Sequence, residues 1–211
     1  MTTPTAQEPL LGRPERLIAL ADGVYAIAIT LLAIDIKLPD GLDSAEFHRQ
    51  LHDLLPQVGA YALSFLVLAA FWRDHHRLFL GVRQVDGLVI RLTLFGLGIA
   101  ALLPFPTSLI AEYAGEPSAV AIYSAAVAAL GSSQFTLLLV VWKRPWLRSV
   151  PLPDQEANAY LADLGATVVV FAATAPLSFL IGSRVVWGWL VLLPVKFVIG
   201  RWSTRVSHSD V

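Results

Sequence analysis

Six apolar stretches, each about as long as a bilayer is thick, constrain this chain more than any other feature of its sequence. A hydrocarbon core about 30 Å thick needs roughly 20 residues of α-helix. The stretches run over residues 17–36, 56–72, 88–111, 118–142, 160–182 and 185–200. They lack the two-residue alternation of a transmembrane β-barrel. The sequence therefore predicts an all-α, polytopic membrane protein with six transmembrane helices per subunit.

Composition agrees with a membrane location and excludes several functions. Hydrophobic residues make up 56% of the chain, charged residues make up 15%, and the mean hydropathy is +0.65. One soluble core cannot bury that much apolar surface. A net charge of -1 gives no reason to expect nucleic-acid binding, and the absence of cysteine excludes disulfides and thiolate metal sites. The first fifteen residues lack the basic start of a cleaved signal peptide, so we expect the first apolar stretch to be retained.

The distribution of basic residues predicts the orientation in the membrane. Twelve of the fifteen Lys and Arg residues lie before the first stretch, around the second connection, after the fourth stretch or near the end of the chain. Under the positive-inside rule, both termini then face the cytoplasm, and the protein is expected in the cell membrane. The predicted organisation is a cytoplasmic segment 1–15, a transmembrane domain 16–202 and a cytoplasmic tail 203–211.

Prolines and one long loop refine this topology. Pro104, Pro106 and Pro176 lie inside the third and fifth stretches, and Pro194 interrupts the last one. Proline is tolerated in membrane helices, so we expect kinks rather than breaks there. In the loop at residues 37–55, apolar residues recur at helical spacing after a cap position at Asp43 or Ser44, which predicts an amphipathic helix at the outer surface.

The first stretch has two distinct faces. On a helical wheel Ile27, Leu31 and Ile34 lie within about 40° of one line, and Thr30 lies about 60° to one side. Asp22 lies about 140° away, on the opposite face. A carboxylate facing lipid would cost several kcal/mol, so Asp22 must face other protein groups. Either it is a structural anchor, which we favour, or it is a proton or cation site within the membrane.

The second stretch ends in the motif FWRDHHRLF, which contains Trp72 and two adjacent histidines. The side chains of His75 and His76 point about 100° apart on a helix, so they do not support a two-histidine metal site. We expect a buried histidine paired with a carboxylate or an indole, with pH sensing as a secondary possibility. We expect no metal and no cofactor. No motif of a catalytic nucleophile, phosphate loop or dinucleotide site occurs, so we expect no enzymatic activity.

Three motifs in order resemble one known family. The segment RLIALADGVYAIAITLLAIDI, residues 16–36, resembles the first-helix signature R-x-x-x-F-S-D followed by G-V-F-A-I-A-I-T-L-L of the endosomal and lysosomal potassium channel family (the transmembrane protein 175 family). The motifs FWRDHHRLF and LLPFPTSLI are similar to those of its second and third helices. The resemblance covers roughly the first half of the chain, and the later helices match only in hydropathy.

The resemblance implies a homotetrameric cation channel whose first helices surround a central pore and which lacks a carbonyl-lined filter loop. The pore-lining positions become Ile27, Leu31 and Ile34, and Thr30 becomes the neighbouring polar layer linked to potassium preference. The permeant ion is K⁺, with other monovalent cations as further candidates, and the partners are the lipid bilayer and copies of the same chain.

The resemblance also implies a structural network that positions the pore helix. Arg16 and Asp22 match the charged ends of the first signature, and their expected partners are Trp72 and His75 or His76 of the second helix. The sequence departs from the family where Leu20 replaces Phe, Ala21 replaces Ser and Thr93 replaces an expected Asn. The lost hydroxyl and amide would remove hydrogen bonds from this network.

Two other classes of protein stay open at the level of the sequence. A proton-coupled transporter would use Asp22, His75 and His76 as a relay. A structural membrane protein would conduct nothing. Neither alternative has a substrate or partner motif of its own in this chain.

Overall fold

The computed structural model describes residues 12–34, 36–113, 115–192 and 194–196. These residues are mostly helical, as the apolar stretches predict. The elements are α1 (Pro14–Leu31), α2 (Ser44–Asp53), α3 (Leu55–Leu80), α4 (Gly87–Leu102), α5 (Pro104–Glu112), α6 (Pro117–Lys143), the short 3₁₀ helix η1 (Pro145–Leu147), α7 (Asp154–Ile181) and the 3₁₀ helix η2 (Ser183–Val191).

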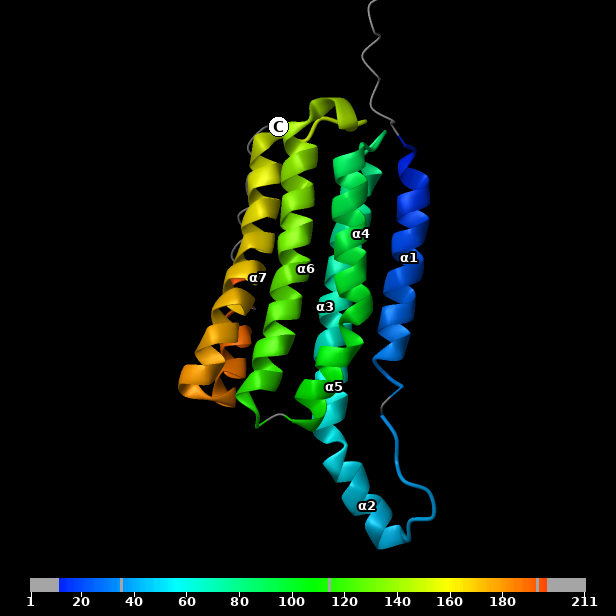
Figure 1. Cartoon of the computed structure of the whole chain (residues 1–211), viewed down its shortest axis with the longest axis vertical. Helices are drawn as coiled ribbons and strands as arrows, with labels where there is room; N and C mark the ends of the chain where they lie inside the picture. The colour runs from blue at the N-terminus through cyan, green and yellow to red at the C-terminus, as the bar shows by residue number, and fades with distance from the viewer. Residues whose placement is uncertain (1–11, 35, 114, 193, 197–211) are drawn as a thin grey trace, which may run out of the picture.

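The long helices run side by side in a bundle (Figure 1). α7 packs along α6, α4 packs on α6, and α1 packs on both α3 and α4. α1 and α7 lie on opposite sides of the bundle in this view, and α2 projects from the end of α3 beyond it (Figure 1). One flank of α1 is therefore not covered by the other described helices.

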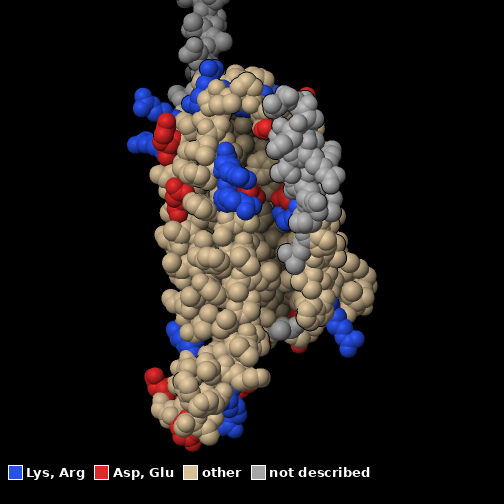
Figure 2. All heavy atoms as spheres, turned by 180° about the vertical axis from the view of Figure 1, so that it is seen from behind, with Lys and Arg blue, Asp and Glu red and all other residues tan. Residues whose placement is uncertain are grey.

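Four spans in the described part of the chain are long and apolar enough to cross a membrane: Ser44–Leu80, Gly87–Glu112, Pro117–Lys143 and Asp154–Ile181. The second span consists of α4 and α5, which are interrupted only at Leu103, directly before Pro104. Pro176 lies inside α7 without interrupting it. Charged side chains gather toward both ends of the face in Figure 2, with an uncharged belt between them. The protein is thus a multi-pass membrane protein.

The boundaries of the first and last membrane helices in the structure differ from those predicted from the sequence. α1 carries Glu15, Arg16 and Asp22 within its 18 residues, and it ends at Leu31 instead of continuing to residue 36. Residues 32–34 form a turn, because the amides of Ala33 and Ile34 bond to carbonyls three residues back, a tighter pattern than that of the α-helix. The sixth stretch is described only in part, since residues 193 and 197–200 lie outside the described residues. The tail 203–211 also lies outside them.

Helix starts follow local capping rules. The amphipathic helix α2 is capped by Asp43 in a capping box, in which the Asp43 side chain accepts from the Glu46 amide and the Glu46 side chain accepts from the Asp43 amide. Asp86 caps α4 by accepting from the amides of Leu88 and Val89 at 3.0 and 2.9 Å. At the other end of a helix, Gly182 adopts φ 75° and terminates α7.

The end of the bundle where α1 begins is held by backbone contacts between distant segments. Gly12 and Val85 exchange two hydrogen bonds of 2.8 and 3.0 Å, just ahead of α1. The amide of Arg83 donates to the carbonyl of Leu147, and the amide of Ser149 donates to the carbonyl of Gly81. The loop between α3 and α4 therefore joins the start of α1 to the loop around η1. Three of the basic segments that the positive-inside rule grouped together, those just before α1, after α3 and after α6, thus lie at one end of the described bundle.

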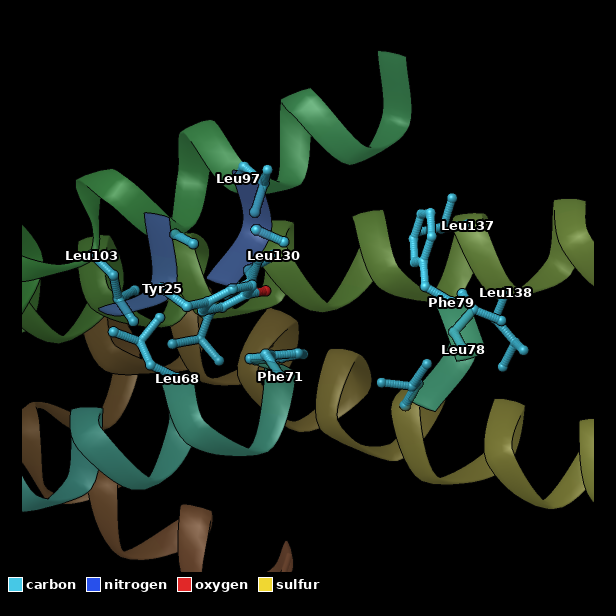
Figure 3. Close-up of a cluster of buried hydrophobic side chains, with 14 of the residues drawn as sticks. Tyr25, Leu68, Phe71, Leu78, Phe79, Leu97, Leu103, Leu130, Leu137 and Leu138 are labelled. Carbon is cyan, nitrogen blue, oxygen red and sulfur yellow. The ribbon is translucent and has the colours of Figure 1, made fainter. Parts of the chain in front are cut away.

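The core lies where α1, α3, α4 and α6 meet. Tyr25 of α1 packs among Leu68, Phe71, Leu97 and Leu130, which come from the other three helices (Figure 3). Their burial anchors the inner face of α1 and so fixes which face is left outside.

Candidate functional site

The middle of the inner face of α1 carries two alanines and one tyrosine. Ala21, Tyr25 and Ala28 are each only 1% exposed. Small residues let the backbone of α1 approach α3 and α4 closely. Burial of this face sets the rotation of the helix about its own axis.

The outer face of α1 carries the predicted pore stripe. Ile27, Leu31 and Ile34 are exposed to 60%, 39% and 55%. Ile27 and Leu31 lie on α1, whereas Ile34 lies in the turn that follows it. The described part of the chain leaves all three side chains uncovered, so the stripe is available to lipid or to another copy of the chain.

Thr30 lies on the same exposed side as the stripe. Its hydroxyl donates to the carbonyl oxygen of Ile27 at 2.9 Å, within its own helix. This bond occupies the proton of the hydroxyl and leaves the oxygen able to accept or to coordinate a cation. Thr30 therefore adds one oxygen to an otherwise apolar face.

Asp22 lies at the boundary between the inner and outer faces of α1, where it is partly buried. The indole Nε1 of Trp72 in α3 donates to its carboxylate at 2.8 Å. The ring of His76 lies against Trp72, with ring centroids 5.7 Å apart. The contact joins α1 to α3, and a hydrogen bond to a carboxylate is stronger than one between neutral groups.

His75 lies in the core of the bundle, where its hydrogen-bond partner is Gln134 and not Asp22. It is 2% exposed, and its Nδ1 lies 3.4 Å from Oε1 of Gln134 in α6. Gln134 in turn donates from Nε2 to the hydroxyl of Tyr25 at 3.2 Å. This chain of side chains links α3, α6 and α1.

The structure separates the five predicted network residues into different surroundings. Asp22, Trp72 and His76 form one cluster, His75 joins Tyr25 and Gln134, and Arg16 is exposed near the start of α1. Tyr25 and Gln134 were not among the residues predicted from the sequence. The one signal for Gln134 was an amide side chain inside an apolar stretch, which must find a partner when buried.

Thr93, which stands where an asparagine was expected, is buried in α4. Its hydroxyl has no hydrogen-bond partner among the described residues. A threonine side chain is shorter than asparagine and offers one donor instead of two. The missing amide is thus not replaced here by another contact of Thr93.

A metal site of three ligands is not present among the described residues, where no three His, Asp or Glu side chains come together. The polar groups around α1 can therefore bond one another and can present Thr30 oxygens, but they do not form a metal cage. What distinguishes this site chemically is an exposed apolar stripe with a single hydroxyl layer.

The sequence of this chain is similar to a family model and to several known proteins. The family model described as "Endosomal/lysosomal potassium channel TMEM175" matches residues 16–104. A potassium channel of Streptomyces collinus is 40% identical over 119 residues, which is 54% of this chain and 58% of that protein. A potassium channel of Chamaesiphon minutus is 33% identical over 149 residues, covering 66% of this chain and 68% of that protein. The chain thus aligns with little more than half of the Streptomyces relative and about two thirds of the Chamaesiphon relative.

A solved structure is similar along almost the whole chain. The crystal structure of a lysosomal potassium-selective channel TMEM175 homologue from Chamaesiphon minutus superimposes with a TM-score of 0.69 and 26% identity. The match covers 88% of this chain and 97% of that one. The similarity in fold therefore extends beyond the region of the sequence motifs.

Proposed function

This chain belongs to the endosomal/lysosomal potassium channel TMEM175 family, and we propose that it forms a potassium-permeable cation channel. The observation that carries the proposal is the exposed stripe of Ile27, Leu31 and Ile34 on a helix whose other face is fully packed. Ion channels are not an enzyme class, and we expect no catalytic activity.

The pore forms between subunits. The described part of one subunit shows no long polar stripe through the membrane, so a conducting path needs several copies around an axis. Gly23 and Ala26 are exposed on the same side of α1, and open space lies beside Gly23. Small exposed residues allow helices of different subunits to approach closely. The number of copies comes from the family resemblance, which implies four, and we propose that they surround a closed symmetry axis with α1 nearest to it.

The stripe acts as a hydrophobic gate in this assembly. Rings of Ile27, Leu31 and Ile34 would narrow the pore, and narrow apolar rings stop conduction when water leaves them. The Thr30 oxygens form the polar layer beside the rings, where they replace part of the water around a K⁺ ion. No carbonyl-lined filter loop is needed for this arrangement.

The location and orientation follow from the charge pattern. We place the protein in the cell membrane with both termini in the cytoplasm, because the basic loops gather at the end where α1 begins. The partners are K⁺, other monovalent cations, lipid and further copies of the chain. The domain limits 1–15, 16–202 and 203–211 belong to the same proposal.

The relay of a proton-coupled transporter finds less support. Asp22 bonds to an indole N–H, which only donates, and His75 contacts Gln134 in place of Asp22. A proton moving from Asp22 through Trp72 to His76 would have to pass the indole N–H of Trp72, which does not release its proton at neutral pH. We assign Asp22, with Trp72 and His76, to holding α1 in place.

Recording from the purified full-length chain in planar bilayers tests the channel directly. Under opposing K⁺ and Na⁺ gradients we expect unitary current steps. The reversal potential should lie closer to the equilibrium potential of K⁺ than to that of Na⁺. Saturable, pH-driven uptake without unitary steps would favour the transporter. Flat recordings from correctly assembled oligomers would favour the structural protein.

The place of α1 can be tested without conduction. Because the chain contains no cysteine, a single introduced cysteine reports on its own position. We expect a short thiol cross-linker to join subunits through Ile27→Cys. Val169→Cys is the matched control, since Val169 is 66% exposed on α7, across the bundle from α1. Equal cross-linking of the two variants, or none at Ile27→Cys, contradicts a central α1.

A further inference from the structure

A second site lies away from α1, at the end of the bundle where the basic loops gather. A cavity of about 750 Å³ opens between α3, α6, α7 and the loop after η1. Its lining contains four basic and three acidic side chains together with an apolar wall. Nothing in the proposed pore uses this cavity.

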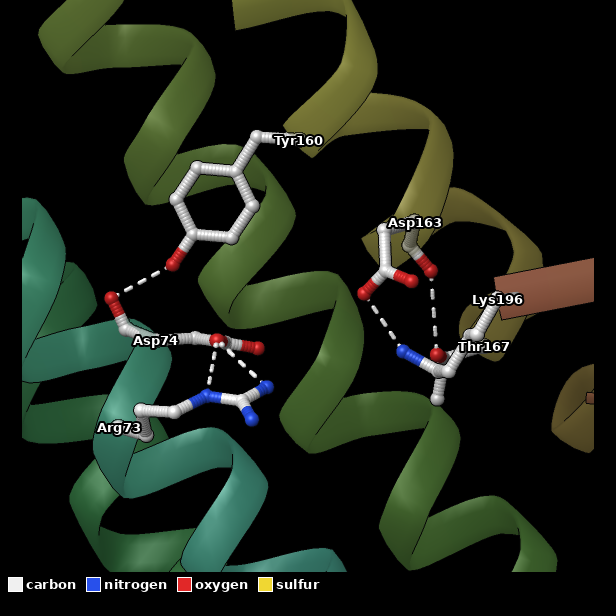
Figure 4. Close-up of polar contacts among 6 residues, drawn as sticks. All are labelled: Arg73, Asp74, Tyr160, Asp163, Thr167 and Lys196. Carbon is white, nitrogen blue, oxygen red and sulfur yellow. Dashed lines mark hydrogen bonds and ion pairs between the residues drawn. The ribbon is translucent and has the colours of Figure 1, made fainter. Parts of the chain in front are cut away.

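Two of the four cations are already neutralised by carboxylates. Arg73 pairs with Asp74 at 3.2 Å, and Lys196 pairs with Asp163 at 2.6 Å (Figure 4). The hydroxyl of Tyr160 donates to the backbone carbonyl of Asp74 at 2.6 Å and so fixes α7 against α3. These contacts build one rigid side of the cavity.

The other two cations, Arg77 and Arg148, have no carboxylate within 4.0 Å in the described part of the chain. Arg148 donates from Nη1 to the carbonyl of Leu152 at 3.2 Å, while its buried Nε has no partner there. Glu156 is the one remaining acidic side chain of the lining. Two guanidinium groups against one carboxylate leave an excess of positive charge and unused donors.

The rest of the lining is apolar and extends into the bilayer region. Leu138 and Val141 of α6 and Leu152 form part of this wall. Asp163 lies nine residues beyond the start of α7, which is roughly 14 Å along the helix. That depth is close to half of a hydrocarbon core about 30 Å thick. A ligand that fills the cavity would be charged at one end and apolar along its length.

We propose that this cavity binds an anionic phospholipid, with its phosphate on Arg77 and Arg148 and its acyl chain against the α6 wall. Guanidinium groups bind phosphate through paired N–H donors. A soluble phosphate would use the same cations but not the apolar wall. The site would lie at the proposed cytoplasmic leaflet, where anionic headgroups meet basic side chains.

Lipid binding to the full-length chain in detergent tests the site by native mass spectrometry, with no need for conduction. Phosphatidylglycerol and phosphatidylcholine with identical acyl chains are the two probes. We expect the wild-type protein to prefer phosphatidylglycerol. Arg77→Gln and Arg148→Gln should each weaken its binding roughly fivefold, as expected for one cation near a headgroup. The double variant should bind both lipids equally.

Matched variants separate the site from general surface charge and from misfolding. Arg91 is exposed near the start of α4 and does not line the cavity, so Arg91→Gln should leave the preference unchanged. Arg77→Lys and Arg148→Lys retain the charge and should retain most of the preference. Equal binding of the two lipids by the wild type overturns the proposal, and so does an Arg91→Gln effect as large as that of Arg77→Gln.

Inorganic phosphate distinguishes the source of the anion. An excess of it should displace phosphatidylglycerol only weakly, because it gains nothing from the apolar wall. Full displacement by inorganic phosphate, with the same dependence on Arg77 and Arg148, would contradict the proposal that the ligand is a lipid. It would indicate a soluble phosphate instead. Because these readouts are binding measurements, failure of the channel proposal would leave them intact.

Discussion

The indole of Trp72 donates a 2.8 Å hydrogen bond to the carboxylate of Asp22 and thereby ties α1 to α3. The two residues are 50 positions apart in the chain. Because the inner face of α1 is packed and this bond lies at its edge, the pair resists rotation of α1. Rotation of this helix is what would move the exposed stripe relative to a neighbouring subunit.

Trp72→Phe should destabilise the bundle more than Asp22→Asn. Phenylalanine removes the donor and leaves the carboxylate without it, whereas asparagine still accepts through its carbonyl oxygen. A hydrogen bond to a charged group contributes about 1.5–3 kcal/mol, so we expect Trp72→Phe to cost about that much. Unfolding in a denaturing detergent measures both variants. Asp22→Ala combined with Trp72→Phe should lower the free energy of unfolding by less than the sum of the two single changes. Strict additivity would show that the bond contributes nothing.

Polar substitutions in the exposed stripe should raise the leak current. Ile27→Asn or Leu31→Ser keeps water in the proposed gate and so lowers the barrier that a dry constriction presents to ions. Currents of the closed channel in reconstituted bilayers are the measurement. Val169→Ser, at an exposed apolar position of α7, is the control and should leave the leak unchanged. Unaltered currents in both stripe variants would remove the stripe from the pore.

Thr30 should matter for ion preference through its oxygen. Thr30→Ser keeps the hydroxyl and should keep most of the preference for K⁺ over Na⁺. Thr30→Val keeps the shape of the side chain but loses the oxygen, so the preference should fall. The reversal potential under bi-ionic K⁺ and Na⁺ conditions measures this. If valine and serine variants show the same permeability ratio, the hydroxyl layer does not select ions.

Gly96 should tolerate no larger residue, because α4 and α6 are very close at this point. A Cβ atom at Gly96 would lie 2.6 Å from the Ser133 Oγ atom. Overpacking of this kind costs about 1–3 kcal/mol, so Gly96→Ala should lower the free energy of unfolding by that amount. Ser133→Ala removes the Oγ atom and should recover part of the loss. Gly98→Ala is the control, since a Cβ atom there meets nothing within 4 Å.

Asp86 should act through two separable contacts. It caps α4, and it forms an ion pair with Arg144 at the end of α6. Asn is also a good cap, so Asp86→Asn should lose only the ion pair. Asp86→Ala should lose both, and the difference between the variants should be about 1 kcal/mol, the usual contribution of a cap. Equal unfolding midpoints for the two variants would mean that the cap adds no stability.

Hydropathy and periodicity predicted the helical class, the amphipathic helix α2 and its cap, and most of the long helices. These are local properties, because segment length, capping residues and spacing act within a few turns of the chain. Periodicity also grouped Ile27, Leu31 and Ile34 on one face, and the structure leaves all three exposed. What surrounds that face stays a prediction, since one subunit does not contain its neighbour.

The polar groups that meet in the core could be identified only from the packed helices. Gln134 bonds to Tyr25 across 109 residues, and Lys196 reaches Asp163 across 33 residues. Such partners depend on the rotation and depth of packed helices, which small differences in side-chain volume set and which no local pattern records. For the same reason no pattern in the sequence predicted the cavity around Arg77 and Arg148. The chain's own hydropathy determined that helices cross a membrane, and their packing determined which faces were left to bind something else.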